Sequence, residues 1–187
     1  MHGIIFSEMR KYVDARLGPS GWANLMKEAG MPKSKMYLAI EEYSDQEAVA
    51  LVTAAAKLTG KSAAVILEDF GEFIAPDLLK MYANLIDPTW KTLDLIEHTE
   101  RTIHTVVRIK NAGARPPELQ VSRAGEDEVV ITYSSPRKMC AVAKGIVKGV
   151  AKHYNERLVI SETSCMLQGR GSCKISVKLA AAKLAAA

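Results

Sequence analysis

The sequence lacks a long hydrophobic run, a secretory leader and a strong excess of charge of either sign. The longest uncharged run, Leu17–Met26, has ten residues and includes glycine, proline and serine, whereas a membrane helix needs about 20 apolar residues. Only a short apolar run precedes Glu8, which is not typical of a secretory signal. The net charge of +4 comes from 25 Lys and Arg against 21 Asp and Glu, and the basic residues are scattered. We therefore expect a protein that neither spans a membrane nor binds nucleic acid.

Cysteine and histidine are also scarce. Three cysteines are an odd number for a disulfide framework, so we expect a reduced, cytoplasmic protein. No two of the four histidines have the i, i+3 or i+4 spacing that would join metal ligands on one helix face; they are His2, His98, His104 and His153. A glycine-rich phosphate loop and a nucleophile elbow are missing too. The sequence therefore does not predict an enzyme.

The composition is that of a globular protein. The 187 residues are 48% hydrophobic and 25% charged, which predicts one domain or two tightly joined subdomains. Pro76 falls inside one of the expected helices, where we expect a kink or a break. Helical periodicity and capping residues predict five helices: Met1–Leu17, Trp22–Ala29 with Ser20 as its cap, Ser44 or Asp45 to Thr59, Ser62–Leu79, and Trp90–Lys110.

The pattern changes after Asn111, where strand signals begin. We expect strands at Glu118–Ser122 and Glu128–Ser134, a helix at Arg137–Tyr154, and a hairpin of Arg157–Leu167 with Cys173–Lys178. The prediction is an α+β fold in one domain, residues 1–177. A helical subdomain (1–88) precedes a β-β-α-β-β subdomain with a small antiparallel sheet (89–177). Residues 178–187 repeat KLAAA and resemble an expression-vector sequence.

His104 lies on an apolar helix face. It follows Leu93 by eleven residues, about three turns, and Ile103, Val106 and Val107 flank it. A histidine in such a position can bind a large apolar cofactor, although most histidines on apolar faces are simply packed or capped.

A second element is Tyr133-Ser134-Ser135-Pro136-Arg137. In an extended segment Tyr133, Ser135 and Arg137 share one face. Two hydroxyls and a guanidinium on one face can bind carboxylates, because arginine forms bidentate, charge-assisted hydrogen bonds. Taken alone, the same residues also suit an edge strand that enters a helix with Arg137 in solvent.

Together these elements resemble the heme nitric oxide/oxygen binding (H-NOX) domain, the bacterial relative of the heme domain of soluble guanylate cyclase. The resemblance covers nearly all of residues 1–177. It depends on an ordered set of motifs: the opening M-x-G-I-I, Trp22, Tyr43-Ser44-Asp45, Phe70-Gly71-Glu72, His104, Gly113 to Pro117, and Tyr133 to Arg137.

The resemblance implies heme b held between the two subdomains. By position, His104 would be the proximal iron ligand, and Tyr133, Ser135 and Arg137 would hold the heme propionates. Pro117 would press on the porphyrin and distort it.

Family members that hold oxygen carry a tyrosine five residues after the motif arginine, and Val142 takes that place here. The matched distal positions also lack a hydrogen-bond donor, although some are ordinary core residues as well; they are Ile5, Met9, Phe70, Ile74 and Ile146, with Phe73 nearby. A hydrogen bond to bound oxygen contributes about 1.5–3 kcal/mol. We therefore expect nitric oxide and carbon monoxide to bind and oxygen to be excluded.

The resemblance also implies how the signal leaves the domain. Nitric oxide weakens the iron–imidazole bond, so His104 would be released and its helix would shift, a two-state change driven by a ligand. The chain contains no recognisable output domain. The expected partner is a separate protein, such as a histidine kinase or a cyclic dinucleotide enzyme.

The three cysteines suggest a second site. Some H-NOX proteins bind zinc through cysteines at the positions of Cys140, Cys165 and Cys173, together with a histidine where this chain has Glu162. The alternatives are three thiolates with Glu162, three thiolates with water, a redox-sensing thiol group, and inert buried cysteines. An alternative function is therefore a thiol or zinc redox sensor. A heme peroxidase is disfavoured, because the matched distal positions offer no acid–base histidine or arginine.

Overall fold

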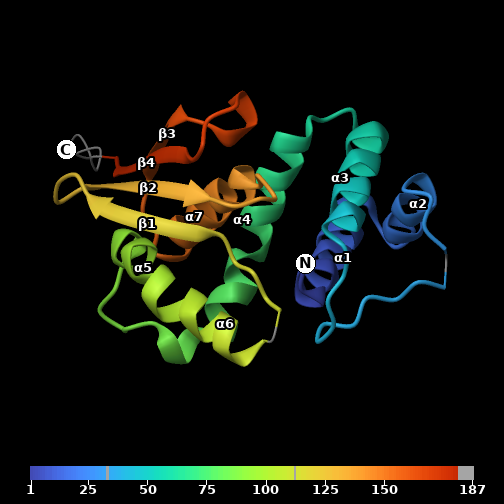
Figure 1. Ribbon diagram of the computed structural model, residues 1–187, viewed down its shortest axis with the longest axis horizontal. Coiled ribbons are helices and arrows are strands. Elements are labelled where there is room, and N and C mark those ends of the chain that lie inside the picture. The colour runs from blue at the N-terminus through green and yellow to red at the C-terminus, as the bar shows by residue number, and fades with distance from the viewer. Residues whose placement is uncertain (33, 112, 181–187) are drawn as a thin grey trace, which may run out of the picture.

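The computed structural model describes residues 1–32, 34–111 and 113–180, and it has the expected α+β architecture (Figure 1). Helix α4 stands between α1–α3 on one side and α7 with the sheet on the other. The helices of the N-terminal part are α1 (Gly3–Leu17), α2 (Gly21–Glu28), α3 (Asp45–Thr59) and α4 (Ala63–Met81).

Two of the predicted helix starts are confirmed by side-chain caps. Ser44 Oγ accepts a hydrogen bond from the Gln46 amide at 3.2 Å, and Ser62 Oγ accepts one from the Val65 amide at 3.4 Å. Gly60, with φ of 69°, ends α3 in the left-handed conformation that suits glycine. Ser20 precedes α2, but its side chain makes no capping bond and the helix begins at Gly21.

The expected break at Pro76 is wrong, because α4 continues without interruption to Met81, whereas the expected kink stays a prediction. A proline inside a helix removes one hydrogen bond, here the bond to the Glu72 carbonyl. That carbonyl lies against α7 (Cys140–His153), where a Cβ on Gly149 would be 2.7 Å from it. We infer that packing against α7 on this side of α4 keeps the helix intact.

The prediction of a single continuous helix over Trp90–Lys110 is also wrong, because the segment is divided into several helical pieces. A short 3₁₀ turn, Ala83–Leu85, precedes α5 (Thr92–His98), a π-helical turn (Glu100–His104) and α6 (Thr105–Lys110). The His104 amide donates to the Thr99 carbonyl, five residues back, at 3.0 Å. The π turn thus adds one residue to the helix at His104, and such turns occur frequently at functional sites.

The sheet is antiparallel, with the strand order β1-β2-β4-β3. Tyr133 pairs with Leu119 on one side and with Cys173 on the other. The strands are β1 (Glu118–Arg123), β2 (Glu128–Ser134), β3 (Leu158–Ser164) and β4 (Cys173–Leu179), with a 3₁₀ turn at Met166–Gln168. Because β4 reaches Leu179, the first two residues of the expected tail belong to the sheet. Residues 181–187 lie outside the described residues, and the origin of the tail stays a prediction.

Helix α7 begins at Cys140, three residues later than expected. The delay comes from a turn in which the Lys138 amide donates to the Ser135 carbonyl at 3.0 Å. Lys138 takes a φ of 52°, a left-handed conformation that a helix interior does not allow. Arg137 therefore lies on a turn between β2 and α7.

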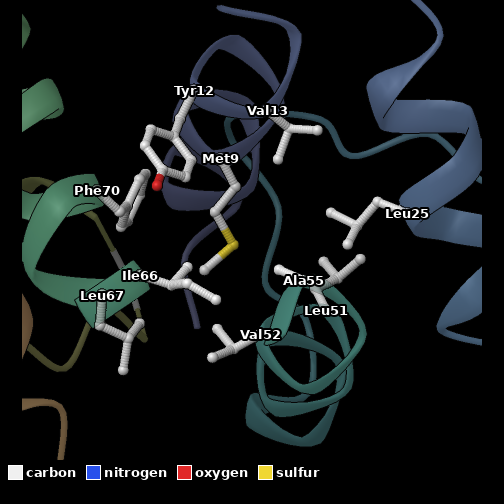
Figure 2. Close-up of a pocket in the computed structure, with 10 residues that line it drawn as sticks. All are labelled: Met9, Tyr12, Val13, Leu25, Leu51, Val52, Ala55, Ile66, Leu67 and Phe70. Atoms are coloured by element: carbon white, nitrogen blue, oxygen red, sulfur yellow. The ribbon is translucent and has the colours of Figure 1, made fainter. Parts of the chain in front are cut away.

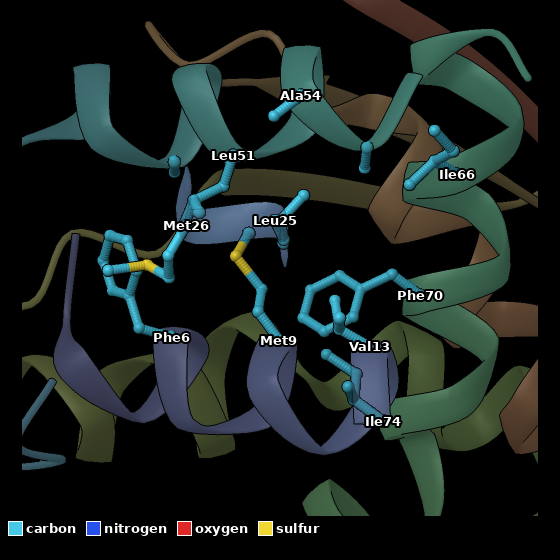
Figure 3. Packing of buried hydrophobic residues seen from close by; sticks show 12 residues of the cluster. Phe6, Met9, Val13, Leu25, Met26, Leu51, Ala54, Ile66, Phe70 and Ile74 are labelled. Carbon is cyan, nitrogen blue, oxygen red and sulfur yellow. The ribbon is translucent and has the colours of Figure 1, made fainter. Parts of the chain in front are cut away.

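Two hydrophobic clusters form the core. One lies among the N-terminal helices and includes Phe6, Leu25 and Leu51 (Figure 3). The other lies between the sheet and α7 and includes Val129 and Ile175. Helix α7 contributes residues to both clusters. The division of the chain into two subdomains at residue 88 stays a prediction.

Helices α4 and α7 approach each other at backbone distance. A Cβ on Gly71 would be 2.2 Å from the Val142 carbonyl oxygen, and one on Gly145 would be 2.0 Å from the Glu68 carbonyl oxygen. Glycine is therefore required at both positions for this packing.

Within the described part of the chain, no single helix has the length and apolar character to cross a membrane. The pair α3 and α4 meets those criteria only jointly, and it is bent by 107°.

Candidate functional site

His104 stands at the end of the π-helical turn and is mostly buried, with 14% of its side chain exposed. Its Nδ1 lies 2.9 Å from Glu100 Oε2. The same carboxylate accepts a hydrogen bond from the Leu119 amide at 3.1 Å and one from Arg108 at 2.6 Å. The Glu100 carboxylate thus connects the histidine to α6 and to the start of β1.

The electrostatics determine which nitrogen of His104 carries the proton. Burial alone would raise the pKa of Glu100, but hydrogen bonds from His104, Arg108 and the Leu119 amide hold that pKa below its usual range. An ionised carboxylate can only accept, so His104 Nδ1 donates. Burial lowers the pKa of His104, against the opposing effects of Glu100 and the Pro117 carbonyl. The imidazole is therefore neutral, and a metal would bind through Nε2.

The Y-x-S-x-R residues lie where β2 ends. Tyr133 and Ser135 are buried, with 3% and 4% exposed. Burial raises the pKa of Tyr133, so its hydroxyl keeps its proton and can donate a hydrogen bond. Arg137 is not in solvent: its Nε donates to Asp45 Oδ1 at 2.8 Å, and its guanidinium donates to the Arg115 carbonyl.

Asp45 is a site residue that the sequence analysis treated only as a helix start and as part of the Tyr43-Ser44-Asp45 motif. It joins Arg137 to the α-amino group of Met1, whose nitrogen lies 3.0 Å from Asp45 Oδ1. Burial would raise the pKa of Asp45, but hydrogen bonds from Arg137 and from the chain terminus lower it. Its place in the Tyr43-Ser44-Asp45 motif was the only signal for it, and the partner 92 residues away is not visible in the sequence.

The structure brings the six predicted distal residues into one hydrophobic cluster. Three are buried, and three are half-buried and pack against them. They come in pairs from α1, α4 and α7: Ile5 and Met9, Phe70 and Ile74, Val142 and Ile146. None of the six side chains carries a hydroxyl, an amide or a charge.

Tyr12 was missed by the sequence analysis, although it lies one helical turn after Met9. It lines a cavity of about 30 Å³ together with Met9, Leu51, Ile66 and other apolar residues (Figure 2). Its hydroxyl donates to Asp69 Oδ2 at 2.8 Å, and Arg16 holds the same carboxylate. Burial and the bond to Asp69 raise the pKa of Tyr12. The Tyr12 hydroxyl, which belongs to a residue lining this cavity, thus already donates its hydrogen bond to Asp69.

The three cysteines and Glu162 form one cluster. All four potential ligand atoms lie within 4.8 Å of one another. Cys165 Sγ is 3.9 Å from Cys140 Sγ and 4.0 Å from Cys173 Sγ, and the three thiols are unpaired. Burial raises the pKa of both Cys140 and Cys173. Glu162 Oε2 accepts from Lys144 at 2.9 Å, while its Oε1 is buried without a hydrogen-bond partner in the described structure.

These features can be compared with known proteins. The Haem-NO-binding family matches residues 2–162. The chain belongs to this family, the H-NOX family. H-NOX domains bind heme and serve as gas sensors.

Solved H-NOX structures share the fold. The H-NOX protein of S. oneidensis in the Fe(II)NO ligation state is 25% identical over 97% of this chain and 100% of its own, with a TM-score of 0.89. The H-NOX domain of Shewanella oneidensis in the Fe(II)CO ligation state is 25% identical over the same shares, with a TM-score of 0.86. The unliganded Fe(II) H-NOX protein of K. algicida is 20% identical over 98% of both chains, with a TM-score of 0.86.

The residues of this H-NOX chain suit heme chemically. A neutral imidazole held by a carboxylate is a typical axial ligand arrangement. A guanidinium with two buried hydroxyls provides charge and donors for propionates. The apolar residues around Ile74 provide a surface of the kind that a porphyrin needs.

Proposed function

We propose that this chain is a heme-based gas sensor that binds nitric oxide and carbon monoxide and excludes oxygen. The observation that carries the proposal is the neutral His104, fixed by Glu100 in a chain of the H-NOX family. Ferrous heme would supply the iron atom to which these gases bind. The group would be heme b, by analogy with the family, and the sequence has no C-x-x-C-H motif for covalent attachment. The proposed role is sensing rather than catalysis.

In this proposal His104 would provide the nitrogen ligand of the iron, and Tyr133, Ser135 and Arg137 would bind the propionates between the two predicted subdomains. Pro117 would press on the porphyrin; its carbonyl already acts on the His104 imidazole. Arg137 would share its charge between a propionate and Asp45. The propionate site would therefore be linked to the start of α3.

The exclusion of oxygen follows from the distal residues. Bound oxygen gains partial negative charge, and a hydrogen bond to it is worth about 1.5–3 kcal/mol, or roughly 10- to 150-fold in affinity. The six distal side chains provide no donor, and the hydroxyl of Tyr12 is bound to Asp69. Nitric oxide depends much less on such a bond, so the same residues favour it.

The signal would pass through the π-helical turn. Release of His104 from iron would free this turn and α6 to move against β1, to which Glu100 is hydrogen-bonded. Such a shift is a two-state change that a separate partner can detect. A histidine kinase or a cyclic dinucleotide enzyme is the partner that we propose, by analogy with the family.

The direct test is His104→Gly, with His98→Gly as the matched control on the same stretch of helix. We expect His104→Gly to lose the ferrous spectrum of the wild type and to regain it when imidazole is added. His98, whose Nδ1 faces the Asp94 carbonyl at 2.8 Å, should be replaceable without this effect. If His104→Gly keeps the native spectrum without imidazole, the axial ligand is another residue.

The cysteine cluster supports a second proposal, a structural zinc site. Tetrahedral zinc with bonds of about 2.3 Å to sulfur places its thiolates about 3.8 Å apart, close to the 3.9 and 4.0 Å seen here. The buried Glu162 Oε1 would be the fourth ligand, because it has no hydrogen-bond partner among the described residues and Glu162 belongs to the cluster. The site would stabilise the chain or, as an alternative function, respond to oxidants as a thiol or zinc redox sensor. Reduced thiols agree with a cytoplasmic protein.

Elemental analysis of protein purified without chelator tests the zinc proposal. We expect about one zinc per chain in the wild type and a large loss in Cys165→Ser. Ser164→Ala is the matched control, since Ser164 is adjacent but its hydroxyl donates to the Ser172 carbonyl. Only traces of zinc in the wild type would contradict the proposal.

A further inference from the structure

Glu100 is more firmly held than a surface carboxylate. Its Oε2 is 2.9 Å from His104 Nδ1 and 3.1 Å from the Leu119 amide, and its Oε1 is 2.6 Å from Arg108. Its backbone is fixed as well, because the Thr105 hydroxyl donates to the Glu100 carbonyl at 3.1 Å. Both oxygens and the main chain are therefore held in place.

An anionic acceptor on Nδ1 changes the chemistry of the opposite nitrogen. The hydrogen bond fixes the tautomer and the ring orientation, and it increases the basicity of Nε2 toward a metal. A charge-assisted bond is about twice as strong as a neutral one. A carboxylate thus has a larger effect on the imidazole than a backbone carbonyl or water in the same place.

We propose that Glu100 is a positioning residue that strengthens the bond between His104 and iron and thereby slows its release when nitric oxide binds. This inference rests on the proposed function, because it concerns the same axial ligand. Arg108 has the opposite effect, since it withdraws negative charge from the carboxylate. Glu100 also accepts a hydrogen bond from the Leu119 amide. A change in the position of His104 would therefore be transmitted to β1, just after Pro117.

The test compares Glu100→Gln and Glu100→Ala with the wild type in the heme-loaded protein. Glutamine keeps an oxygen that can accept from Nδ1 but removes the charge, whereas alanine removes both. The readouts are the iron–histidine stretching frequency in resonance Raman spectra and the stopped-flow rate of histidine loss after nitric oxide is added. We expect the frequency to fall from wild type to glutamine to alanine, and the rate to rise about tenfold or more in the alanine variant.

Glu97→Gln is the matched control. Glu97 pairs with Arg123 at 2.8 Å, much as Glu100 pairs with Arg108, and the two glutamates are similarly exposed, at 35% and 29%. Glu97→Gln should leave both readouts unchanged. Arg108→Gln should raise the stretching frequency, a sign that general damage to the helix would not produce.

Equal frequencies and rates in the wild type and both Glu100 variants would overturn the inference, as would equal shifts in Glu97→Gln and Glu100→Gln. If the Glu100 variants fail to fold, Arg108→Gln decides, and an unchanged or lowered frequency there counts against the inference. These outcomes leave the proposed function intact. A wild-type chain that takes up no heme contradicts the proposed function itself.

Discussion

A single hydrogen bond to a partly charged ligand is worth about 1.5–3 kcal/mol, and the hydroxyl of Tyr12 is already engaged in another one. Tyr12 lines the cavity beside Met9, and its hydroxyl donates a hydrogen bond to Asp69 Oδ2 at 2.8 Å. Arg16 holds Asp69 in turn. A free donor would therefore have to come from a new side chain.

Val142→Tyr would supply such a donor, by the family pattern in which oxygen-binding members carry a tyrosine there. We expect the affinity for oxygen to rise roughly 10- to 150-fold, the value of one hydrogen bond to a partly charged ligand. Oxygen equilibrium titration of the reduced protein measures it. Val142→Phe has nearly the same bulk without the hydroxyl and should show no gain. Equal affinities in the two variants would contradict the role of the donor.

Among single residues, the sequence predicts those that belong to motifs. It misses those whose role depends on contacts with distant parts of the chain. His104, Tyr133, Ser135 and Arg137 were predicted as site residues from the ordered set of family motifs, because each local pattern alone also suited an ordinary structural position. Asp45 meets Arg137 across 92 residues of chain, and no local signal shows this pairing. Glu100 could have been identified, because its i, i+4 spacing from His104 places the two side chains together on a helix.

Among the elements, α4 and α7 join the two hydrophobic clusters through glycine contacts. A Cβ on Gly145 would lie 2.0 Å from the Glu68 carbonyl oxygen. That oxygen belongs to the backbone, so the helices would have to separate. Two ion pairs beside this contact, Lys148 with Glu68 and Lys152 with Glu72, connect the same helices.

Gly145→Ala should lower the free energy of unfolding by about 1–3 kcal/mol, the usual cost of overpacking. Gly125→Ala is the matched control, because its Cβ would meet no atom closer than 3.6 Å. Urea unfolding of both variants measures the difference. A Gly145→Ala variant as stable as Gly125→Ala would contradict the close packing.

The link between α3 and the turn after β2 depends on the charge of Asp45. Arg137 and the chain terminus lower the pKa of Asp45 in the folded state, so this stabilisation is present above about pH 4 and is lost as the pH falls further. Asp45→Asn should therefore be less stable than the wild type at pH 7, by less than about 1 kcal/mol because Asp45 is 46% exposed. The difference should be smaller at pH 3 than at pH 7 in urea unfolding. An equal difference at both pH values would show that charge is not the cause.

Helical periodicity predicts where helices lie but not their internal irregularities. The apolar spacing of residues 90–110 is compatible with a straight helix, whereas the structure has a π turn at His104, where Glu100 accepts a hydrogen bond from Leu119 in β1. Pro76 shows the opposite error, because packing against α7 preserves a helix that a local rule would break.

For the whole molecule, the two predicted halves are joined by the α4–α7 packing and by the Arg137–Asp45 ion pair. The network of His104, Glu100 and Leu119 lies within the second half and connects the π-helical turn to β1. The overall order of helices followed by a small antiparallel sheet was predicted from the sequence and is confirmed. The strand order β1-β2-β4-β3 was not predicted, since it depends on how the second hairpin docks on the first.

The most direct test of the proposed sensor is an optical spectrum of the reduced, anaerobic protein, followed by nitric oxide in one sample and air in another. We expect bound heme with His104 as its axial ligand, a clear spectral change with nitric oxide, and no stable complex with oxygen. A stable oxygen complex, or a protein that takes up no heme, would contradict the proposed function.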